Sequence, residues 1–362
     1  MKVFHCDRCR QWLFFENSRC LGCGGVLAFL PDRVTMAVLE PEGDLWRSAG
    51  RRYRLCDNYR RENICNWAVP AEDPLVLCRS CRLTRVIPDL DRPGRKEAWY
   101  RLEVAKRRLL YGLMRLRLMD GVGGPDQGPQ YRFLADPPGA PPVLTGHDGG
   151  VITINLAEAD DAERERRRLA LGEPYRTLLG HFRHESGHYY WDRLVRDSPW
   201  LEPFRQRFGD ERRDYREALH NHYAENPRDG WQERYISAYA ASHPWEDWAE
   251  TWAHYLHLTD TLETAAGFGL SLRPSADRLP LQVGADPLAG GEASFDGLLA
   301  SWLPLTYFLN CLNRGLGLAD AYPFVLKDPV IDKLRFVHRV IAAARTPGGG
   351  RAGLVSTLQE VP

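Results

Sequence analysis

The stretch "HFRHESGHYYWD", residues 181–192, contains the pattern H-E-x-x-H, with His184 and His188 four residues apart. On an α-helix, residues four apart lie on one face, so two imidazoles can bind the same cation. Glu185 then lies next to that cation and can take a proton from a metal-activated water. The pattern predicts the active site of a zinc hydrolase; the alternative is a chance pattern on a histidine-containing helix.

Two imidazoles alone bind zinc poorly, and a catalytic site needs a third protein ligand and one position left for water. A close H-x-x-G-x-x-H extension of the motif is absent, so the third ligand has to come from a separate helix. The downstream candidates are His220, His222, Glu225, Glu233, His243, Glu246, Asp247, Glu250, His254 and His257.

The segment "AYAASHPWEDWAETWAHYLH", residues 238–257, stands out among these candidates. Pro244 suits a position near a helix start. Trp245, Trp248 and Trp252 recur at three- and four-residue steps, which is typical of a helix face packed in a core. The segment therefore predicts a helix whose tryptophan stripe is part of the core.

Glu246 and Glu250 lie one turn apart on another stripe of that helix. Two stacked carboxylates repel each other unless a cation or an imidazole N–H lies opposite them. One as a zinc ligand and the other as an acceptor for a ligand histidine would resolve this conflict. Spacing does not decide which is which, and a solvated acidic face is the alternative.

The N-terminal segment "CDRCRQWLFFENSRCLGCGG", residues 6–25, carries two C-x-x-C pairs around a strand-like run. Each pair turns tightly enough for both thiolates to reach one tetrahedral ion, which predicts a zinc ribbon. So short a segment has too little core to fold alone, so metal binding would supply much of its folding energy. The alternative is four free thiols. The predicted ligands are Cys6, Cys9, Cys20 and Cys23.

A second group of cysteines lies in "LCDNYRRENICNW" and "LCRSCRL". It contains only one C-x-x-C pair, but four cysteines between cysteine-free stretches predict a second closed zinc site. The alternative is buried, unligated thiols, which pack as small hydrophobes. The predicted ligands are Cys56, Cys65, Cys78 and Cys81. Cys311, on an apolar helical pattern, is expected to be a core residue.

The composition narrows the class of protein. The chain has 362 residues with 48 Lys+Arg and 48 Asp+Glu, so no net charge favours nucleic acid or an anionic membrane. No apolar run has the length of a membrane-spanning helix, and the start "MKVFHCDRCR" lacks the apolar region of a secretory signal. We therefore expect a cytoplasmic protein, and a reducing compartment favours metal ligation over disulfides.

Apolar periodicity predicts a helix over residues 96–119, strands at 131–135 and 149–156, and the motif helix over about 175–195. The strand at 149–156 suits an edge strand along which a peptidase lays an extended substrate. The expected domains are a zinc ribbon at 1–30, a second cysteine-rich module at 31–92, a metallopeptidase domain at 93–345 and a disordered tail at 346–362.

The motifs "CNW", "LCRSCRL", "HFRHESGHYYWD" and "HPWEDWAETWAHYLH" together resemble the bacterial zinc-binding metallopeptidase family that carries an N-terminal zinc ribbon. At the site level, the chain also resembles Mlc titration factor and the catalytic domain of anthrax lethal factor. Those proteins combine H-E-x-x-H with a Tyr-x6-Glu pattern, which "YAASHPWEDWAE" matches at Tyr239 and Glu246. Asp247 departs from that pattern, because an aromatic residue is expected there. The remoter resemblance implies Glu246 as the third zinc ligand and Tyr239 as a stabiliser of the oxyanion.

The resemblance implies an α+β protein: a zinc ribbon and a second four-cysteine zinc module, then a mostly helical, gluzincin-like zincin core with a small sheet. We expect a metallopeptidase with one catalytic and one or two structural zinc ions. In it, Glu185 is the general base and Glu250 orients a ligand histidine. The expected partners are a peptide or protein substrate and a protein that docks on the ribbon, with no specific nucleic-acid signal. The alternatives are a zinc amidohydrolase that does not act on peptides, and a ribbon-based binding protein with a dormant core.

Overall fold

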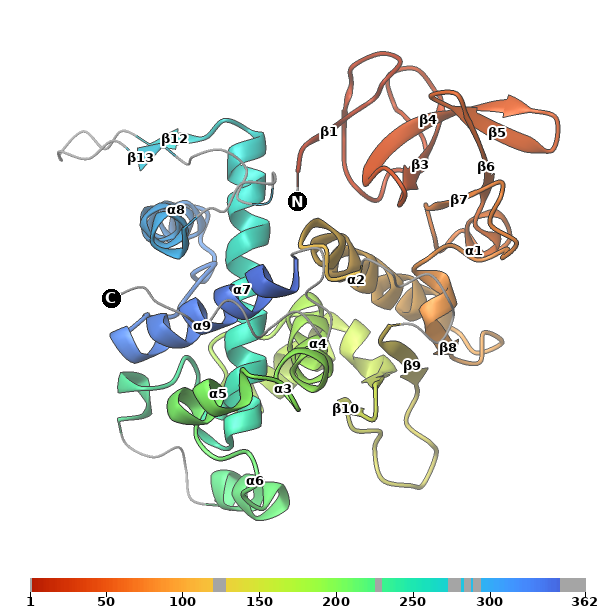
Figure 1. The fold of residues 1–362 in the computed structure, drawn as a ribbon. Helices are drawn as coiled ribbons and strands as arrows, with labels where there is room; N and C mark the ends of the chain where they lie inside the picture. Colours follow the sequence, from red (N-terminus) through yellow and green to blue (C-terminus); the bar gives the residue numbers. More distant parts are fainter. Residues whose placement is uncertain are drawn as a thin grey trace. The chain divides into compact units, whose positions relative to one another are not determined.

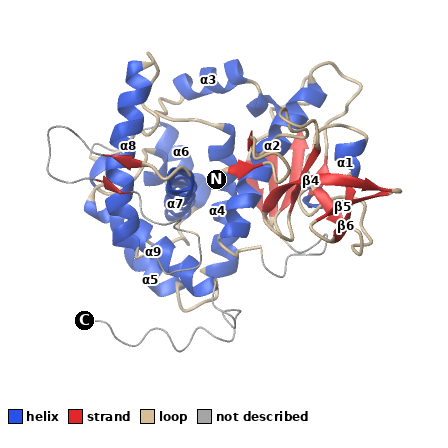
Figure 2. Ribbon diagram, turned by 90° about the horizontal axis from the view of Figure 1, so that it is seen from above, coloured by secondary structure: helices blue, strands red, loops and turns tan. Residues whose placement is uncertain are grey.

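A computed structural model of the chain describes residues 2–119, 128–224, 230–272, 281–282, 288 and 294–345. The chain divides into two compact units: Met1–Arg115 with Met119–Leu171, and Leu116–Leu118 with Gly172–Pro362. The predicted tail at 346–362 lies outside the described residues. Sheets in the first unit and helices in the second confirm the α+β class (Figure 2). Within the described residues, no helix combines the length and the apolar character needed to cross a bilayer.

Unit 1 begins with a two-stranded hairpin and continues into a five-stranded antiparallel sheet in the order β3-β4-β5-β6-β7. The hairpin strands are β1 (Phe4–His5) and β2 (Trp12–Leu13). The sheet strands are β3 (Val26–Leu30), β4 (Thr35–Glu42), β5 (Leu45–Ser48), β6 (Arg51–Leu55) and β7 (Ala68–Pro70). Phe29 bridges to Trp67, which brings the first and last strands together. Because β3 pairs with β4, the boundary predicted at residues 30/31 falls in a turn between two paired strands.

A short helix α1 (Asp57–Arg60) and the 3-10 turn η1 (Cys81–Leu83) carry parts of the second cysteine group. Helix α2 (Arg95–Arg115) then confirms the predicted amphipathic helix, which ends four residues earlier than expected. Its apolar positions Leu102, Ala105, Leu109 and Leu113 are all buried, as their spacing requires.

The second sheet of unit 1 has the order β10-β11-β9-β8. Its strands are β8 (Thr84–Val86), β9 (Gln130–Leu134), β10 (Gly146–Asp148) and β11 (Val151–Asn155), followed by η2 (Leu156–Ala159) and α3 (Asp161–Ala170). The two strands predicted from β-branched and aromatic runs are β9 and β11. The expectation of an edge strand at β11 is wrong, because β11 pairs with β9 on one side and β10 on the other.

Unit 2 is mainly helical (Figure 1). Its helices are α4 (Leu178–Leu194), α5 (Leu201–Phe208), α6 (Tyr215–Ala224), α7 (Pro244–Gly267), α8 (Phe295–Gly315) and α9 (Asp328–Ala344). Short 3-10 turns η3 (Trp231–Glu233) and η4 (Tyr239–Ala241) precede α7, and a small hairpin of β12 (Ser271–Leu272) and β13 (Leu281–Gln282) follows it. The long α7 packs against α4, η4, α8 and α9 and is therefore the central element of the unit.

Candidate metal centres

Helices α4 and α7 each begin at a side-chain cap. Thr177 caps α4 by accepting a hydrogen bond from the Gly180 N–H at 3.0 Å. The His243 side chain caps α7 by accepting from the Trp245 N–H at 3.1 Å, and Pro244 occupies the first helical position. These caps fix the residue at which each helix starts. The start of a helix in turn determines the face on which its functional residues lie.

Ser186 and Gly187, the two residues between Glu185 and His188, allow α4 to lie close to α7. A Cβ on Gly187 would lie 2.9 Å from the Cα of Ala249, so only glycine allows the two helices to approach this closely. The indole N–H of Trp248 donates to the Gly187 carbonyl at 2.9 Å, and that of Trp252 donates to the Ser186 hydroxyl at 3.1 Å. Both indoles are fully buried, which agrees with the predicted core stripe.

This packing brings His184, His188 and Glu246 into one group. Oε2 of Glu246 lies 3.0 Å from Nε2 of His184 and 3.4 Å from Nε2 of His188. Among the described residues, this group of His and Glu is the one that joins both motif histidines with a carboxylate. The candidate Glu225 lies outside the described residues.

The three donor atoms fit a zinc ion. Tetrahedral zinc with bonds of about 2.0–2.1 Å places its ligand atoms roughly 3.3 Å from one another, close to the two distances found. Glu246 is 1% exposed, and its Oε2 accepts no hydrogen bond of normal geometry from the described residues. A buried carboxylate oxygen that faces two imidazole nitrogens without such a bond suits a shared cation. The donor set of two imidazoles and one carboxylate is also one that zinc prefers.

Other side chains form hydrogen bonds that support two of these three residues, His184 and Glu246. Oε1 of Glu250 lies 2.7 Å from Nδ1 of His184, and the Ser237 hydroxyl donates to Oε2 of Glu250 at 2.7 Å. The Tyr215 hydroxyl donates to Oε1 of Glu246 at 2.6 Å. Sequence reasoning proposed Glu250 for such a role but missed Ser237 and Tyr215, which have no motif or periodicity to mark them.

Trp245 differs from the other two tryptophans of its stripe. Its ring lies over His188, with ring centroids 3.9 Å apart, and it is only partly buried. The prediction of a core stripe therefore holds for Trp248 and Trp252, whereas Trp245 packs against a candidate ligand.

The electrostatics of the group favour a positive charge between its members. Burial would lower the pKa of His184, but Glu246 and Glu250 outweigh burial and raise it well above its ordinary value. Burial would raise the pKa of Glu246, but His188 and His184 hold it well below its ordinary value. The same carboxylates that would retain a proton on an imidazole also attract a metal cation, which competes for that nitrogen.

Glu185 is buried beside the same two histidines, His184 and His188. Burial raises its pKa above the ordinary value, and the neighbouring His184 and His188 oppose that rise. It is 6% exposed, and its Oε2 has no hydrogen-bond partner among the described residues. An unpaired carboxylate oxygen beside the group can accept a proton or a hydrogen bond from a bound water.

Tyr239 lies next to the group on η4. Its ring centroid is 5.9 Å from that of His184 and 5.9 Å from that of His222. Burial, followed by the Glu246 carboxylate, raises the pKa of Tyr239 well above its ordinary value, so the phenol keeps its proton. It can therefore donate a hydrogen bond to a group that develops negative charge.

Other downstream candidates for the third ligand have other partners. Asp247 accepts from the buried ammonium group of Lys333 at 2.6 Å. Nδ1 of His254 lies 2.8 Å from the Tyr322 hydroxyl. His243 caps α7, as described above. None of these three belongs to the His184–His188–Glu246 group.

The first cysteine group has the spacing of a four-thiolate metal site. The Sγ atoms of Cys6 and Cys23 lie 3.7 Å apart, and those of Cys9 and Cys20 lie 3.5 Å apart. Zinc–sulfur bonds of about 2.3 Å place tetrahedral sulfurs roughly 3.8 Å apart, whereas a disulfide needs about 2.05 Å. All four thiols are free of disulfides and form one group, in which Cys9 is exposed and Cys23 half-buried.

The second cysteine group consists of Cys56, Cys65, Cys78 and Cys81, and all four are buried. The Sγ atoms of Cys65 and Cys78 lie 3.7 Å apart, again the separation expected around zinc. Backbone N–H groups donate to the sulfurs of Cys56, Cys65 and Cys78 at 3.3–3.4 Å. Such bonds favour the thiolate, which is the form of cysteine that binds zinc. Cys311 lies on the exposed surface of α8, so the expectation that it belongs to the core is wrong.

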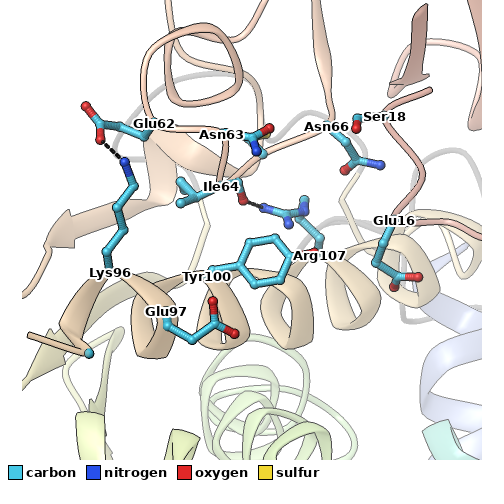
Figure 3. A pocket seen from close by; sticks show the side chains of 12 residues that line it. Glu16, Ser18, Glu62, Asn63, Ile64, Asn66, Lys96, Glu97, Tyr100 and Arg107 are labelled. Atoms are coloured by element: carbon cyan, nitrogen blue, oxygen red, sulfur yellow. Dashed lines mark hydrogen bonds and ion pairs between the residues drawn. The ribbon is translucent and has the colours of Figure 1, made fainter.

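Unit 1 also contains a polar cavity of about 570 Å³ beside α2 (Figure 3). Two interactions are drawn in Figure 3. The Lys96 ammonium donates to the Glu62 carboxylate at 2.9 Å, and the Arg107 guanidinium donates to the Ile64 carbonyl at 2.8 Å. Its lining contains Cys65 but no histidine, so it is separate from the His184–His188–Glu246 group.

Comparison with known proteins identifies the family of the chain. Residues 95–340 match the family described as "Putative zinc-binding metallo-peptidase", and residues 3–92 match a zinc-ribbon domain. Uncharacterized proteins of Mycobacterium tuberculosis and Mycobacterium bovis are each 44% identical to the chain over 345 residues, which cover 94% of this chain and 95% of each relative. No solved structure matches the chain. The motifs in the sequence predicted the same family of zinc-binding metallo-peptidases. The family match spans more than half of the chain, so the chain belongs to this family.

Proposed function

We propose that the chain hydrolyses peptide bonds with one zinc ion held by His184, His188 and Glu246. The observation that carries the proposal is the position of Glu246 Oε2, 3.0 and 3.4 Å from the two imidazole nitrogens. We further propose that each cysteine group holds one structural zinc ion, which gives three ions per chain. The family supports a peptidase; the ligand set and the ion count are our own inference.

His184, His188 and Glu246 would hold the zinc ion, which when bound would lower the pKa of a water molecule and polarise the carbonyl of the substrate. Glu185 then takes the proton from the attacking water and returns it to the leaving amine. Its buried Oε2, which has no partner among the described residues, can accept that proton. Glu185 is therefore a general base that does not bind the metal.

The remaining residues orient the reacting groups. The 2.7 Å contact from Glu250 to Nδ1 of His184 fixes the tautomer that leaves the Nε2 lone pair facing the other donors. The ring of Tyr239 lies near that of His184, and its hydroxyl would donate to the oxygen that becomes negative during attack. This bond contributes mainly in the transition state, because the ground-state carbonyl carries less charge.

The test compares wild-type protein with the Glu185→Gln variant on a pool of peptides from a digested proteome. Glutamine keeps the size of the side chain but cannot accept the proton, so cleavage should slow by about 10²–10⁴-fold while zinc content stays the same. Glu202→Gln, an exposed change on α5, is the matched control and should cleave like wild type.

Each other outcome has a distinct meaning. Equal cleavage by wild type and Glu185→Gln would contradict the proposed role of Glu185. Cleavage of small amides but not of peptides would indicate an amidohydrolase instead. A wild type that binds three zinc ions yet cleaves neither class would favour a dormant core that serves a ribbon-based binding protein.

A further inference from the structure

The two carboxylate oxygens of Glu246 have different neighbours. Oε2 faces Nε2 of His184 and of His188. Oε1 accepts the hydrogen bond of 2.6 Å from the Tyr215 hydroxyl. A phenol is protonated at neutral pH, so Tyr215 can only donate in this contact. The carboxylate is therefore held so that one oxygen is already engaged.

Packing around Tyr215 fixes the position of its ring. Tyr215 is the first residue of α6, and its ring lies edge-on against His243 and Trp245, with centroids 5.3 and 5.9 Å apart. Nε2 of His243 lies 3.2 Å from the carbonyl of Arg213, which links the start of α7 to the segment just before α6. Tyr215 thus reaches Glu246 from a separate helix through a defined arrangement of aromatic rings.

We propose that Tyr215 is a positioning residue that restricts Glu246 to binding zinc through Oε2 alone. The inference deepens the proposed function and rests on it, because it requires Glu246 to be a zinc ligand. A carboxylate that binds through one oxygen leaves three protein donors around the ion and keeps the fourth position for water. If Glu246 bound through both oxygens, it would occupy that position. A hydrogen bond to a ligating carboxylate is the kind of outer contact that sets ligand orientation.

The Tyr215→Phe variant removes the hydroxyl and keeps the ring. We would measure the affinity of the His184–His188–Glu246 site for zinc by competition with a chelator, and the visible absorption of protein that carries Co²⁺ at this site. We expect the affinity to fall by about 10–100-fold. The Co²⁺ absorption spectrum should also change, because a second Glu246 oxygen would replace water in the fourth position. The control is Tyr307→Phe on α8, where the tyrosine is 75% exposed, and it should change neither quantity.

A double-mutant cycle separates positioning from a merely structural role. If Tyr215 acts through Glu246, adding Tyr215→Phe to Glu246→Gln should cost less affinity than adding it to wild type. The proposal is overturned if Tyr215→Phe costs the same affinity in both backgrounds. It is also overturned if the Tyr215→Phe variant binds zinc within about twofold of wild type and has an unchanged Co²⁺ spectrum. Circular dichroism and the zinc retained by the cysteine groups report folding. If Tyr215→Phe fails that check, Tyr215→His, which keeps a ring and an N–H donor, replaces it in the cycle.

The His184→Ala variant distinguishes failure of this inference from failure of the proposed function. If His184→Ala keeps the third zinc ion, the ligand set itself is wrong. If His184→Ala loses the ion while Tyr215→Phe binds it as tightly as wild type, the site stands and only the positioning role of Tyr215 is contradicted.

Discussion

The cysteine groups of unit 1 and the His184–His188–Glu246 group of unit 2 differ in how many protein atoms surround the space for a cation. Each cysteine group brings four sulfurs together, the number that a closed zinc site uses, and the pairs Cys6–Cys23, Cys9–Cys20 and Cys65–Cys78 lie 3.5–3.7 Å apart. In unit 2, two nitrogens and one oxygen come together, one atom fewer than a closed site of four ligands uses. A closed set can stabilise a fold but gives no access to a reacting water, whereas an open set allows chemistry.

The two kinds of site also differ in what supports the ligands. Sulfurs of the second cysteine group accept hydrogen bonds from nearby backbone, such as the bond of 3.4 Å from the Trp67 N–H to Cys65. The candidate ligands of unit 2 contact side chains distant in sequence, as His184 contacts Glu250 and Glu246 accepts from Tyr215. A change in a cysteine group should therefore affect folding, and a change in unit 2 should affect metal affinity and rate. The following predictions test this contrast, starting with the largest effect.

Cys65→Ala should have the largest effect, because it removes one ligand from a fully buried set. Three thiolates would remain without charge compensation, and loss of a structural metal destabilises a protein by on the order of 4 kcal/mol or more. We expect the melting temperature of unit 1 to fall by about 8–16 °C, with one zinc ion lost. Differential scanning calorimetry and elemental analysis check this, with the exposed Cys311→Ala as the control. An unchanged melting temperature would mean that the second cysteine group does not hold a structural ion.

The variants Glu246→Ala and Glu250→Ala should have different effects, because Glu246 is proposed to bind zinc and Glu250 is proposed to orient His184. Loss of Glu246 removes one of three donors, so the zinc site of unit 2 should empty and cleavage should stop. Loss of Glu250 leaves all three donors and should cost about 10–100-fold in affinity or activity. Zinc content and cleavage rate of both variants decide the matter. If Glu250→Ala empties the site and Glu246→Ala keeps its zinc, the two roles must be exchanged.

Tyr239→Phe should have a smaller effect, confined to the rate. The hydroxyl is proposed to donate only as the oxyanion forms, so zinc content should not change and kcat should fall while KM stays similar. Loss of one hydrogen-bond donor to an oxyanion lowers kcat by up to about 10²–10³-fold. Because Tyr239 offers a single neutral phenol, the loss of kcat should be at or below the lower end of that range. Steady-state kinetics on a cleaved peptide provide the test. A variant with full kcat, or one that loses zinc, would show that Tyr239 has a different role.

Regular patterns explain why much of this arrangement follows from sequence. The i, i+4 spacing of His184 and His188 and the paired C-x-x-C turns of the ribbon are local, because one turn of backbone sets the distance between the ligands. The burial of Leu102, Leu109 and Leu113 on α2 follows from the same helical period. Glu246 is different, since spacing left Glu250 as an equal alternative and only the resemblance to other zinc enzymes favoured it.

Sequence patterns do not predict contacts between residues that are far apart in the chain or that lie in irregular segments. Tyr215 and Glu246 are 31 residues apart and meet through packing of α6 against the start of α7. Ser237 lies in an irregular segment, where no periodicity marks a functional position. Cys311 follows an apolar pattern, yet its position lies on the exposed face of α8 because tertiary packing covers only one side of that helix. Sequence thus indicates ligands on regular elements better than the residues that hold them.

The most direct test of the contrast between closed and open sites is the zinc content of the wild-type protein, purified without added metal, during treatment with a chelator. Three ions per chain are expected at the start. One should leave first together with peptidase activity, while two stay with the folded cysteine groups because thiolate sets bind zinc tightly. His184→Ala should begin with two ions and show only the slow phase. A single ion per chain, with the eight clustered cysteines freely reactive toward thiol reagents, would contradict the account.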